Sequence, residues 1–256
     1  MHKTGFYALA LVVATSFVAL QISSAQASEK IGLAPLTELA ESGVPDAQWL
    51  LGRRYQLGDG VEKNPREARR WYRKAAEQGN VTAQLDLARL YDNGDGVQPD
   101  RAEALKWYRK AATGGDALSQ FLLGSYYQVG QDVPMNKLEA VAWYRKAADQ
   151  GLSVAQLNLG VMHRNGDGIP RNDSEAAKWY LKAAKQGEVK AQFNLGNLYY
   201  KGDGVPRDFV EAYKWYNLAA AKNHEGAKSS RAELEKEMSK EQIAEAQRLS
   251  SKWELN

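Results

Sequence analysis

The chain has 256 residues, of which 44% are hydrophobic and 25% are charged, and its formal net charge is +3. These values are ordinary for a soluble globular protein. Basic and acidic residues alternate along the whole sequence, whereas nucleic-acid-binding proteins gather their basic residues on one face, so we expect no nucleic-acid partner. The sequence has no cysteine, which excludes disulfides, a lipid-modified N-terminal cysteine and thiolate metal ligands.

Residues 1–27 have the pattern of a secretory signal peptide. Lys3 supplies a positive start, no charge occurs from Phe6 to Leu20, and the segment ends in Ala25-Gln26-Ala27, the small-x-small pattern that signal peptidase cuts. A membrane-spanning helix needs about 20 apolar residues, so the uncharged stretch is too short to cross comfortably. We expect a mature protein that begins at Ser28 in the periplasm or outside the cell, and an uncleaved membrane anchor is the alternative.

A repeat with a period of 36 residues follows. A Trp-Tyr pair recurs five times, an Ala-Ala pair follows each one, and a glutamine keeps the same period from Gln48 to Gln192. The tryptophans are Trp71, Trp107, Trp143, Trp179 and Trp215. The full repeats are 47–82, 83–118, 119–154, 155–190 and 191–226. Residues 28–46 match the second half of a repeat, so we expect them to form an N-terminal cap.

Each repeat is predicted to hold two helices. The first, such as 83–91, places leucines and a tyrosine mostly on one face. It ends at a Gly-Asp-Gly turn, such as Gly94-Asp95-Gly96, where glycine permits a positive φ, and Val97 follows as an apolar anchor. A small residue in the middle of each first helix should let it approach its neighbours closely. These residues are Gly52, Ala88, Gly124, Gly160 and Gly196.

The second helix of each repeat has clear start and stop signals. An Asn or Asp precedes it, and a Glu three residues later predicts a capping box. The N-cap residues are Asn64, Asp100, Asn136, Asn172 and Asp208. Gly79, Gly115, Gly151, Gly187 and Asn223 stand where these helices should end.

The pattern degenerates after residue 226, and residues 227–256 are predicted to form C-terminal capping helices. One covers 227–237, and the other follows Met238-Ser239 with Ile243, Ala246 and Trp253 on one stripe. Hairpins of this length cannot bury their apolar faces alone, so they must stack. We therefore expect an all-α fold, a right-handed superhelical solenoid of five helical hairpins with partial capping repeats at both ends.

The residue pattern resembles a known family. Ala-Gln-x-x-Leu-Gly-x-x-Tyr, then Gly-Asp-Gly-Val, then Glu-Ala-x-x-Trp-Tyr-x-Lys-Ala-Ala is similar to the SEL-one-like repeat, a relative of the tetratricopeptide repeats. The resemblance covers roughly residues 47–226 and departs at Gln131-Asp132 and at Leu218. It implies an α-solenoid adaptor or regulator, often in bacterial envelopes, whose groove holds a protein partner.

Catalytic and metal-binding interpretations find little support. The Gly-Asp-Gly loops lack the alternating acids and distal Glu of a calcium loop. His163 takes the place of a repeat tyrosine and should be packed, and His224 has no clustered partner. Some members of the resembling family are described as binding or cleaving β-lactams, but no Ser has a Lys three residues later, as the nucleophile motif of such enzymes requires. We expect no enzyme, cofactor or metal site, and a β-lactam-interacting hydrolase is the least favoured alternative.

The partner should bind where the repeats differ. In related helical repeats the first helices line the concave groove, and amide and guanidinium groups there can hold a peptide backbone or a carboxylate. The candidate groove residues are Arg53, Arg89, Asn158, Asn194, Asn197 and Tyr200. The leading hypothesis is an exported adaptor or regulator that binds a protein partner of the cell envelope.

A basic ladder on the second helices supports an alternative function. It consists of Lys74, Lys110, Lys146 and Lys182, reinforced by Arg73, Arg109 and Arg145. It would attract an anionic glycan or an acidic partner, which suits a glycan-binding module in cell-wall or exopolysaccharide assembly. A solvated helix edge beside the row of glutamates is the plainer interpretation of the same residues.

Overall fold

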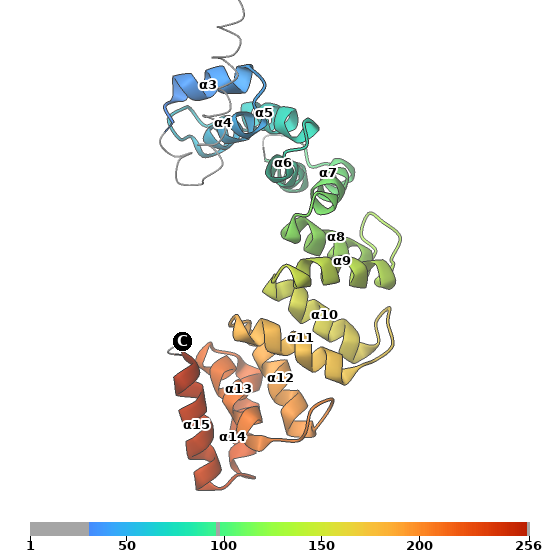
Figure 1. Cartoon of the computed structure of the whole chain (residues 1–256), viewed down its shortest axis with the longest axis vertical. Helices are drawn as coiled ribbons and strands as arrows, with labels where there is room; N and C mark the ends of the chain where they lie inside the picture. The colour runs from blue at the N-terminus through green and yellow to red at the C-terminus, as the bar shows by residue number, and fades with distance from the viewer. Residues whose placement is uncertain (1–30, 96–97, 255–256) are drawn as a thin grey trace, which may run out of the picture. The chain divides into compact units, whose positions relative to one another are not determined.

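A computed structural model describes residues 31–95 and 98–254. The expected signal peptide, the first residues of the N-terminal cap and the anchor Val97 lie outside the described residues. Within the described part, the chain forms thirteen α-helices and no strand (Figure 1). It divides into two compact units, of which the first ends at Ser119 and the second begins at Gln120. The predicted all-α solenoid of helical hairpins is confirmed.

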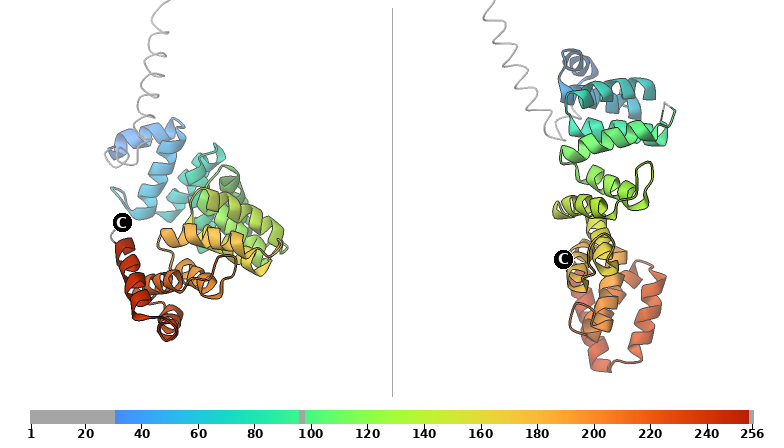
Figure 2. Two further views of the ribbon diagram at one scale, coloured as in Figure 1. Left: turned by 60° about the horizontal axis from the view of Figure 1, so that its bottom comes forward. Right: turned by 90° about the vertical axis from the view of Figure 1, so that its right-hand side faces the viewer.

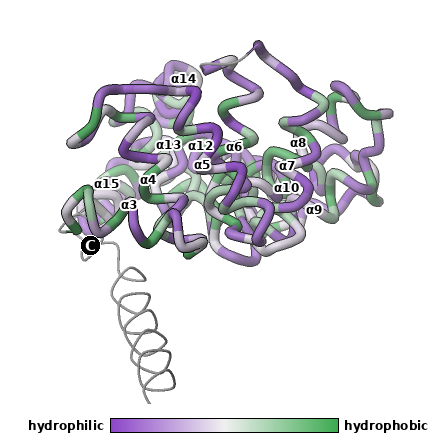
Figure 3. The backbone as a smooth tube through the Cα atoms, turned by 90° about the horizontal axis from the view of Figure 1, so that it is seen from above, coloured by the Kyte–Doolittle hydropathy of each residue, from purple (hydrophilic) through white to green (hydrophobic). Residues whose placement is uncertain are grey.

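Every repeat consists of two helices of 13 residues each. The first helices are α4 (Pro45–Leu57), α6 (Val81–Asn93), α8 (Ala117–Val129), α10 (Ser153–Asn165) and α12 (Val189–Lys201). The second helices are α5 (Pro65–Glu77), α7 (Arg101–Thr113), α9 (Lys137–Asp149), α11 (Asp173–Lys185) and α13 (Phe209–Ala221). Apolar segments alternate with hydrophilic ones along the helices, as the amphipathic pattern requires (Figure 3).

The mid-helix glycines bring the two helices of one repeat together. A Cβ added at Gly160 would lie 2.6 Å from the ring of Tyr180, and one added at Gly52 would lie 2.7 Å from the ring of Tyr72. Gly124 and Gly196 face Tyr144 and Tyr216 in the same way. The tyrosine ring therefore occupies the space that a side chain would fill, which explains why a small residue recurs at this position.

Four of the periodic glutamines join a first helix to the helix that precedes it. Gln84 Nε2 donates a hydrogen bond to the Ala76 carbonyl oxygen at 3.0 Å, in the last turn of the preceding second helix. Gln48, Gln156 and Gln192 make the same bond. A glutamine at the C-terminal end of the second helix in the first, third and fourth repeats donates to the periodic glutamine of its own repeat, as Gln186 does to Gln156. Gly114 stands at this place in the second repeat. Lys222 replaces that glutamine in the fifth repeat, and Gln192 Oε1 is left buried without a hydrogen bond.

The second helices begin as predicted. The predicted capping box is wrong in one of its two bonds, the one from the backbone N–H of the N-cap residue to the side chain of the glutamate three residues later. The side chain of Asn172 accepts from the backbone N–H of Glu175 at 3.0 Å, and the other four caps do the same. The backbone N–H of Asn172, however, donates to the carbonyl oxygen of His163. The capping glutamates are thus free for other partners, and Glu139 accepts from the indole N–H of Trp143 at 3.0 Å.

Both ends of the repeat array are covered by additional helices. Helix α3 (Leu33–Glu41) buries Leu36 and Ala40 against α4. At the other end, α14 (Glu225–Glu235) and α15 (Lys240–Glu254) pack beside α13 (Figure 2). Trp253 meets Trp215 edge-on with ring centroids 5.3 Å apart. None of the described helices has the length and apolar character needed to cross a bilayer.

Candidate functional site

The predicted groove residues all lie on first helices, but they fall into two groups. Arg53 on α4 and Arg89 on α6 belong to the first unit, and both are exposed. The other four lie in the second unit and are partly buried: Asn158, Asn194, Asn197 and Tyr200. The two arginines of the first unit act on one carboxylate, that of Asp86, whereas Asn197 and Tyr200 in the second unit make their contacts with residues outside their group. Each group is therefore described by itself.

In the first unit the two arginines surround a carboxylate, and we call Trp49, Arg53, Asp86 and Arg89 the aspartate cluster. Asp86 accepts a hydrogen bond from Trp49 Nε1 at 2.8 Å and lies 3.7 Å from Arg89 Nη1. The guanidinium of Arg53 lies over the Trp49 ring, 5.9 Å from its centroid. Burial raises the pKa of Asp86, and the Trp49 hydrogen bond and the two arginines oppose that shift. Two exposed guanidinium groups beside one carboxylate leave capacity to bind an acidic group.

In the second unit two of the candidates already have internal partners. Asn197 Oδ1 accepts from the hydroxyl of Tyr216 at 2.7 Å. The hydroxyl of Tyr200 donates to Glu237 at 2.8 Å, and its ring stacks on Phe209 with centroids 5.7 Å apart. Tyr200 is therefore held by the segment that joins the two C-terminal helices, whereas Asn197 is held by the second helix of its own repeat.

The amides of Asn158 and Asn194 occupy the same position in neighbouring repeats. Asn158 hydrogen-bonds the hydroxyl of Tyr144, whose pKa is raised by burial. No hydrogen bond involves the side chain of Asn194 within the part of the chain that the structure describes, so its amide is available to a partner.

Tyrosine hydroxyls from the second helices orient polar side chains on the first helices. Tyr72 donates to Gln56 at 2.8 Å, and Tyr144 donates to Gln128 at 2.7 Å. Burial raises the pKa of Tyr180 and that of Tyr216 to about 12, so these hydroxyls stay protonated at neutral pH. The first-helix face thus carries polar groups whose orientation is set by the core.

The basic ladder has a structural role. Each of its four lysines places its ammonium group over the face of the tryptophan three residues before it, at 3.8–4.2 Å from the ring centroid. Such cation–π contacts contribute about 0.5–1 kcal/mol each at exposed sites. This contact accounts for the recurrence of lysine without any ligand.

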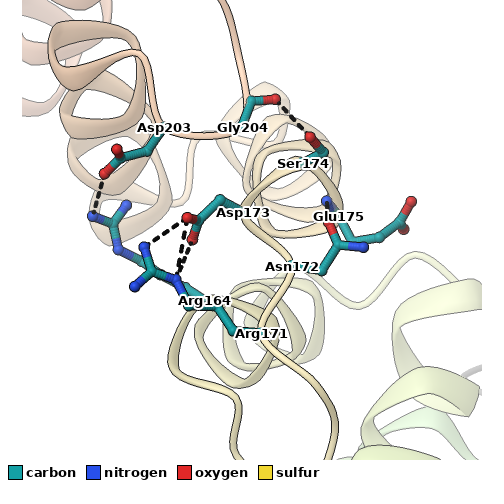
Figure 4. Close-up of polar contacts among 8 residues, drawn as sticks. All are labelled: Arg164, Arg171, Asn172, Asp173, Ser174, Glu175, Asp203 and Gly204. Atoms are coloured by element: carbon teal, nitrogen blue, oxygen red, sulfur yellow. Dashed lines mark hydrogen bonds and ion pairs between the residues drawn. The ribbon is translucent and has the colours of Figure 1, made fainter.

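The Gly-Asp-Gly loops dock onto the preceding repeat (Figure 4). Asp203 pairs with Arg164 at 3.3 Å, and the carbonyl oxygen of Gly204 accepts from the hydroxyl of Ser174 at 2.9 Å. A Cβ at Gly204 would lie 2.2 Å from the backbone of Asp173, so only glycine fits there. Among the described residues, no three His, Asp or Glu side chains gather as metal ligands would.

His163 is packed in the place of a repeat tyrosine, as predicted, with 7% of its surface exposed. Its Nε2 lies 3.3 Å from Arg145 Nη2. Burial, and then the nearby arginine, lower the pKa of His163 below its usual 6.5, while Glu175 acts in the opposite direction. The side chain is therefore a neutral core residue at neutral pH.

Sequence reasoning missed Trp49 and Asp86. The position of Trp49 holds leucine or phenylalanine in the other repeats. That of Asp86 holds leucine in the first and third repeats and the asparagines Asn158 and Asn194 in the fourth and fifth. An alignment of the repeats, examined for residues that differ in kind from the leucines at the same position, would have found both Trp49 and Asp86.

Comparison with known proteins identifies the repeat. The Sel1 repeat model matches residues 45–80, 81–116, 117–152, 153–188 and 189–224. No curated protein matches the chain.

Two solved structures are similar over most of this chain. One is a protective antigen present in uropathogenic Escherichia coli strains, with 39% identity over 85% of this chain and a TM-score of 0.73. The chain spans about half of that protein, 47% of its length. A Sel1 repeat protein from Oxalobacter formigenes is 34% identical, with 82% of this chain and 84% of that one covered and a TM-score of 0.71. Because five contiguous Sel1 repeats make up most of its length, the chain belongs to the Sel1 repeat family.

Proposed function

We propose that this protein is an exported, non-catalytic scaffold that binds a partner protein through outward residues of its first helices. One observation carries the proposal. The buried residues of the first helices are similar in all repeats, whereas their outward positions change, as Arg53, Arg89, Ser125, Val161 and Asn197 illustrate at one place. Sel1 repeat proteins generally mediate protein–protein interactions, and the family is generally a non-enzymatic scaffold.

The chemistry of the two groups suggests what they bind. In the first unit, the guanidinium groups of Arg53 and Arg89 can bind a carboxylate of the partner in bidentate fashion. In the second unit, the amide of Asn194 offers both donors and an acceptor, which suits a peptide backbone. Both groups are polar, so the partner protein need not bury a large apolar surface.

Export is part of the proposal and rests on the pattern of residues 1–27. The likeness to a protective antigen supports it, because such a protein must be accessible to the immune response. Mass spectrometry of the natively expressed protein should find Ser28 at the N-terminus, in the periplasmic or secreted fraction. An intact Met1 on protein from the cytosolic fraction would overturn this part of the proposal.

Partner binding is tested by capture from the cell envelope with crosslinking. The double variant Arg53→Gln/Arg89→Gln and the single variant Asn194→Ala should each reduce capture of the same envelope protein by tenfold or more. Both changes leave the core untouched, so the melting temperature should stay near that of the wild type.

The control is Lys110→Gln/Lys146→Gln on the basic ladder. It removes two charges of the same sign from the second helices and should leave capture unchanged. Loss of capture in the ladder variant alone, with strong salt dependence, would move the binding surface to the second helices and contradict the proposal.

A further inference from the structure

A cavity of about 270 Å³ in the first unit is lined by three arginines and a tyrosine. Arg69, Arg70 and Arg73 come from α5, and Tyr91 comes from the end of α6. None of them belongs to the first-helix residues that we propose to bind the partner protein. We call these four residues the arginine pocket.

The positive charge of the arginine pocket is only partly neutralised. Arg70 pairs with Glu67 at 3.2 Å. Arg73 donates to the hydroxyl of Tyr91 at 2.6 Å, and its nearest carboxylate, Glu103, lies 3.9 Å away. Glu103 is itself held by Lys106 at 2.8 Å.

Arg69 carries the excess charge. No carboxylate pairs with it among the residues that the structure describes, although its side chain is partly buried. Arginine stays charged at all relevant pH values. A partly desolvated guanidinium without a counter-charge gains from binding an anion.

The other repeats show that the fold does not need arginine here. The position of Arg69 holds Leu105, Val141, Ala177 and Tyr213, which are at most 5% exposed. In the third repeat, the residues that correspond to the whole pocket are Val141, Ala142, Arg145 and, from the next helix, His163. The repeated fold therefore favours an apolar residue at this place, and the first repeat has replaced it with a cation.

We propose that the arginine pocket binds a phosphate or sulfate group carried by a small molecule. Guanidinium groups recognise tetrahedral oxyanions through paired N–H donors, and the excess positive charge matches a dianion. The cavity is larger than the anion alone needs, which leaves space for the group that carries it. This inference does not depend on the proposed binding of a protein partner.

The test is a titration of the purified protein with inorganic phosphate at constant ionic strength, followed by NMR of the arginine Nε–H signals. Saturable shifts should be confined to Arg69, Arg70 and Arg73. Inorganic sulfate is the second probe, and saturation by either anion supports the proposal because both present the same tetrahedral oxygens.

Variants separate binding from folding. Arg69→Leu installs the residue that the second repeat has at this position, so the protein should melt at or above the wild-type temperature while its affinity for phosphate falls about tenfold, as expected for the loss of one charge-assisted contact. Arg145→Gln, at the matching place in the third repeat, should leave the affinity unchanged. Linear shifts that never saturate, shifts shared by arginines of every repeat, or unchanged affinity in Arg69→Leu would overturn the proposal.

Discussion

The second helices and the first helices of this protein differ in which of their residues recur from one repeat to the next. Each second helix begins at an Asn or Asp cap with bond lengths of 3.0–3.2 Å to the residue three positions on. In four of the five, a lysine also lies over the tryptophan three residues before it, and in the fifth Lys214 lies over Trp215. The first helices repeat only the residues that face inward, and they vary at the outward positions. Stability is thus built from one set of contacts that recurs along the chain, and the proposed function assigns recognition to residues that occur once.

The comparison is tested most strongly by removing a second-helix tryptophan. Trp179 is 5% exposed and packs with Tyr144, Leu159 and Met162 in one core cluster. Trp179→Ala should therefore destabilise the protein by about 3–5 kcal/mol, the usual cost of truncating a buried aromatic residue. Urea unfolding followed by circular dichroism measures this change.

The matched control is Trp143→Ala. Trp143 occupies the same repeat position but is only partly buried, so its loss should cost less than the loss of Trp179. An equal cost at both positions would mean that the recurring contacts with lysine and glutamate, and not burial, dominate the contribution of the tryptophans.

A second test adds a single carbon where the two helices of a repeat meet. Gly160→Ala places a Cβ 2.6 Å from the ring of Tyr180, and overpacking of this kind costs about 1–3 kcal/mol. Ala88→Gly, the reverse change at the same position in the second repeat, should cost only about 1 kcal/mol through helix propensity. Melting temperatures that rank the two variants in the opposite order would refute the role given to the glycines.

A third test exploits the side-chain caps, which every second helix has and which the first helices α4, α10 and α12 lack. Asn172 caps α11 through its side chain, whereas Glu188 precedes α12 without a side-chain cap. Asn172→Ala should destabilise by about 1 kcal/mol, and Glu188→Asn should stabilise by up to a similar amount. Thermal melts of the two variants should therefore move in opposite directions, and a shift of both in one direction would contradict this account.

Much of the fold follows from signals that lie within one hairpin. The caps, the turn glycines and the apolar spacing act over a few residues, so the helices could be placed from the sequence alone. The partner of each capping glutamate could not, because the N-cap N–H and the tryptophan N–H compete for one carboxylate. In the structure the N-cap N–H donates to a backbone carbonyl oxygen nine residues earlier, as Asn136 does to Tyr127, and Glu139 accepts from Trp143.

The candidate site was less predictable than the fold. Arg53 and Arg89 were found because they are exposed charges at variable positions. The partners of Tyr200 and Asn197 were not foreseen, because Glu237 lies in the region where the repeat degenerates and Tyr216 reaches across from the other helix. Contacts of this kind depend on how the helices pack, and the 36-residue period of the sequence does not indicate them.

The smallest expected effect concerns His163, the one first-helix position where a histidine replaces the repeat tyrosine. Burial and Arg145 lower the pKa of His163 in the folded protein below the usual 6.5, so the unfolded chain takes up a proton first as the pH falls. Stability should therefore decline as the pH drops below about 6.5, and the decline should end once the folded-state pKa is passed. The carboxylates with lowered pKa values, such as Glu103 and Glu175, titrate below their ordinary 4.5, outside this window.

His163→Tyr restores the residue of the other repeats and should flatten the pH dependence of the urea midpoint between pH 7 and pH 5. The new hydroxyl can accept from Arg145 as Tyr91 accepts from Arg73, so stability at pH 7 should change little. In Arg145→Gln the nearby positive charge is gone, the pKa of His163 should rise toward its usual value, and the slope should shrink without vanishing because burial remains. A wild-type midpoint that stays constant from pH 7 to pH 5, or one whose slope survives in His163→Tyr, would show that the charge of this histidine does not limit the stability of the second unit.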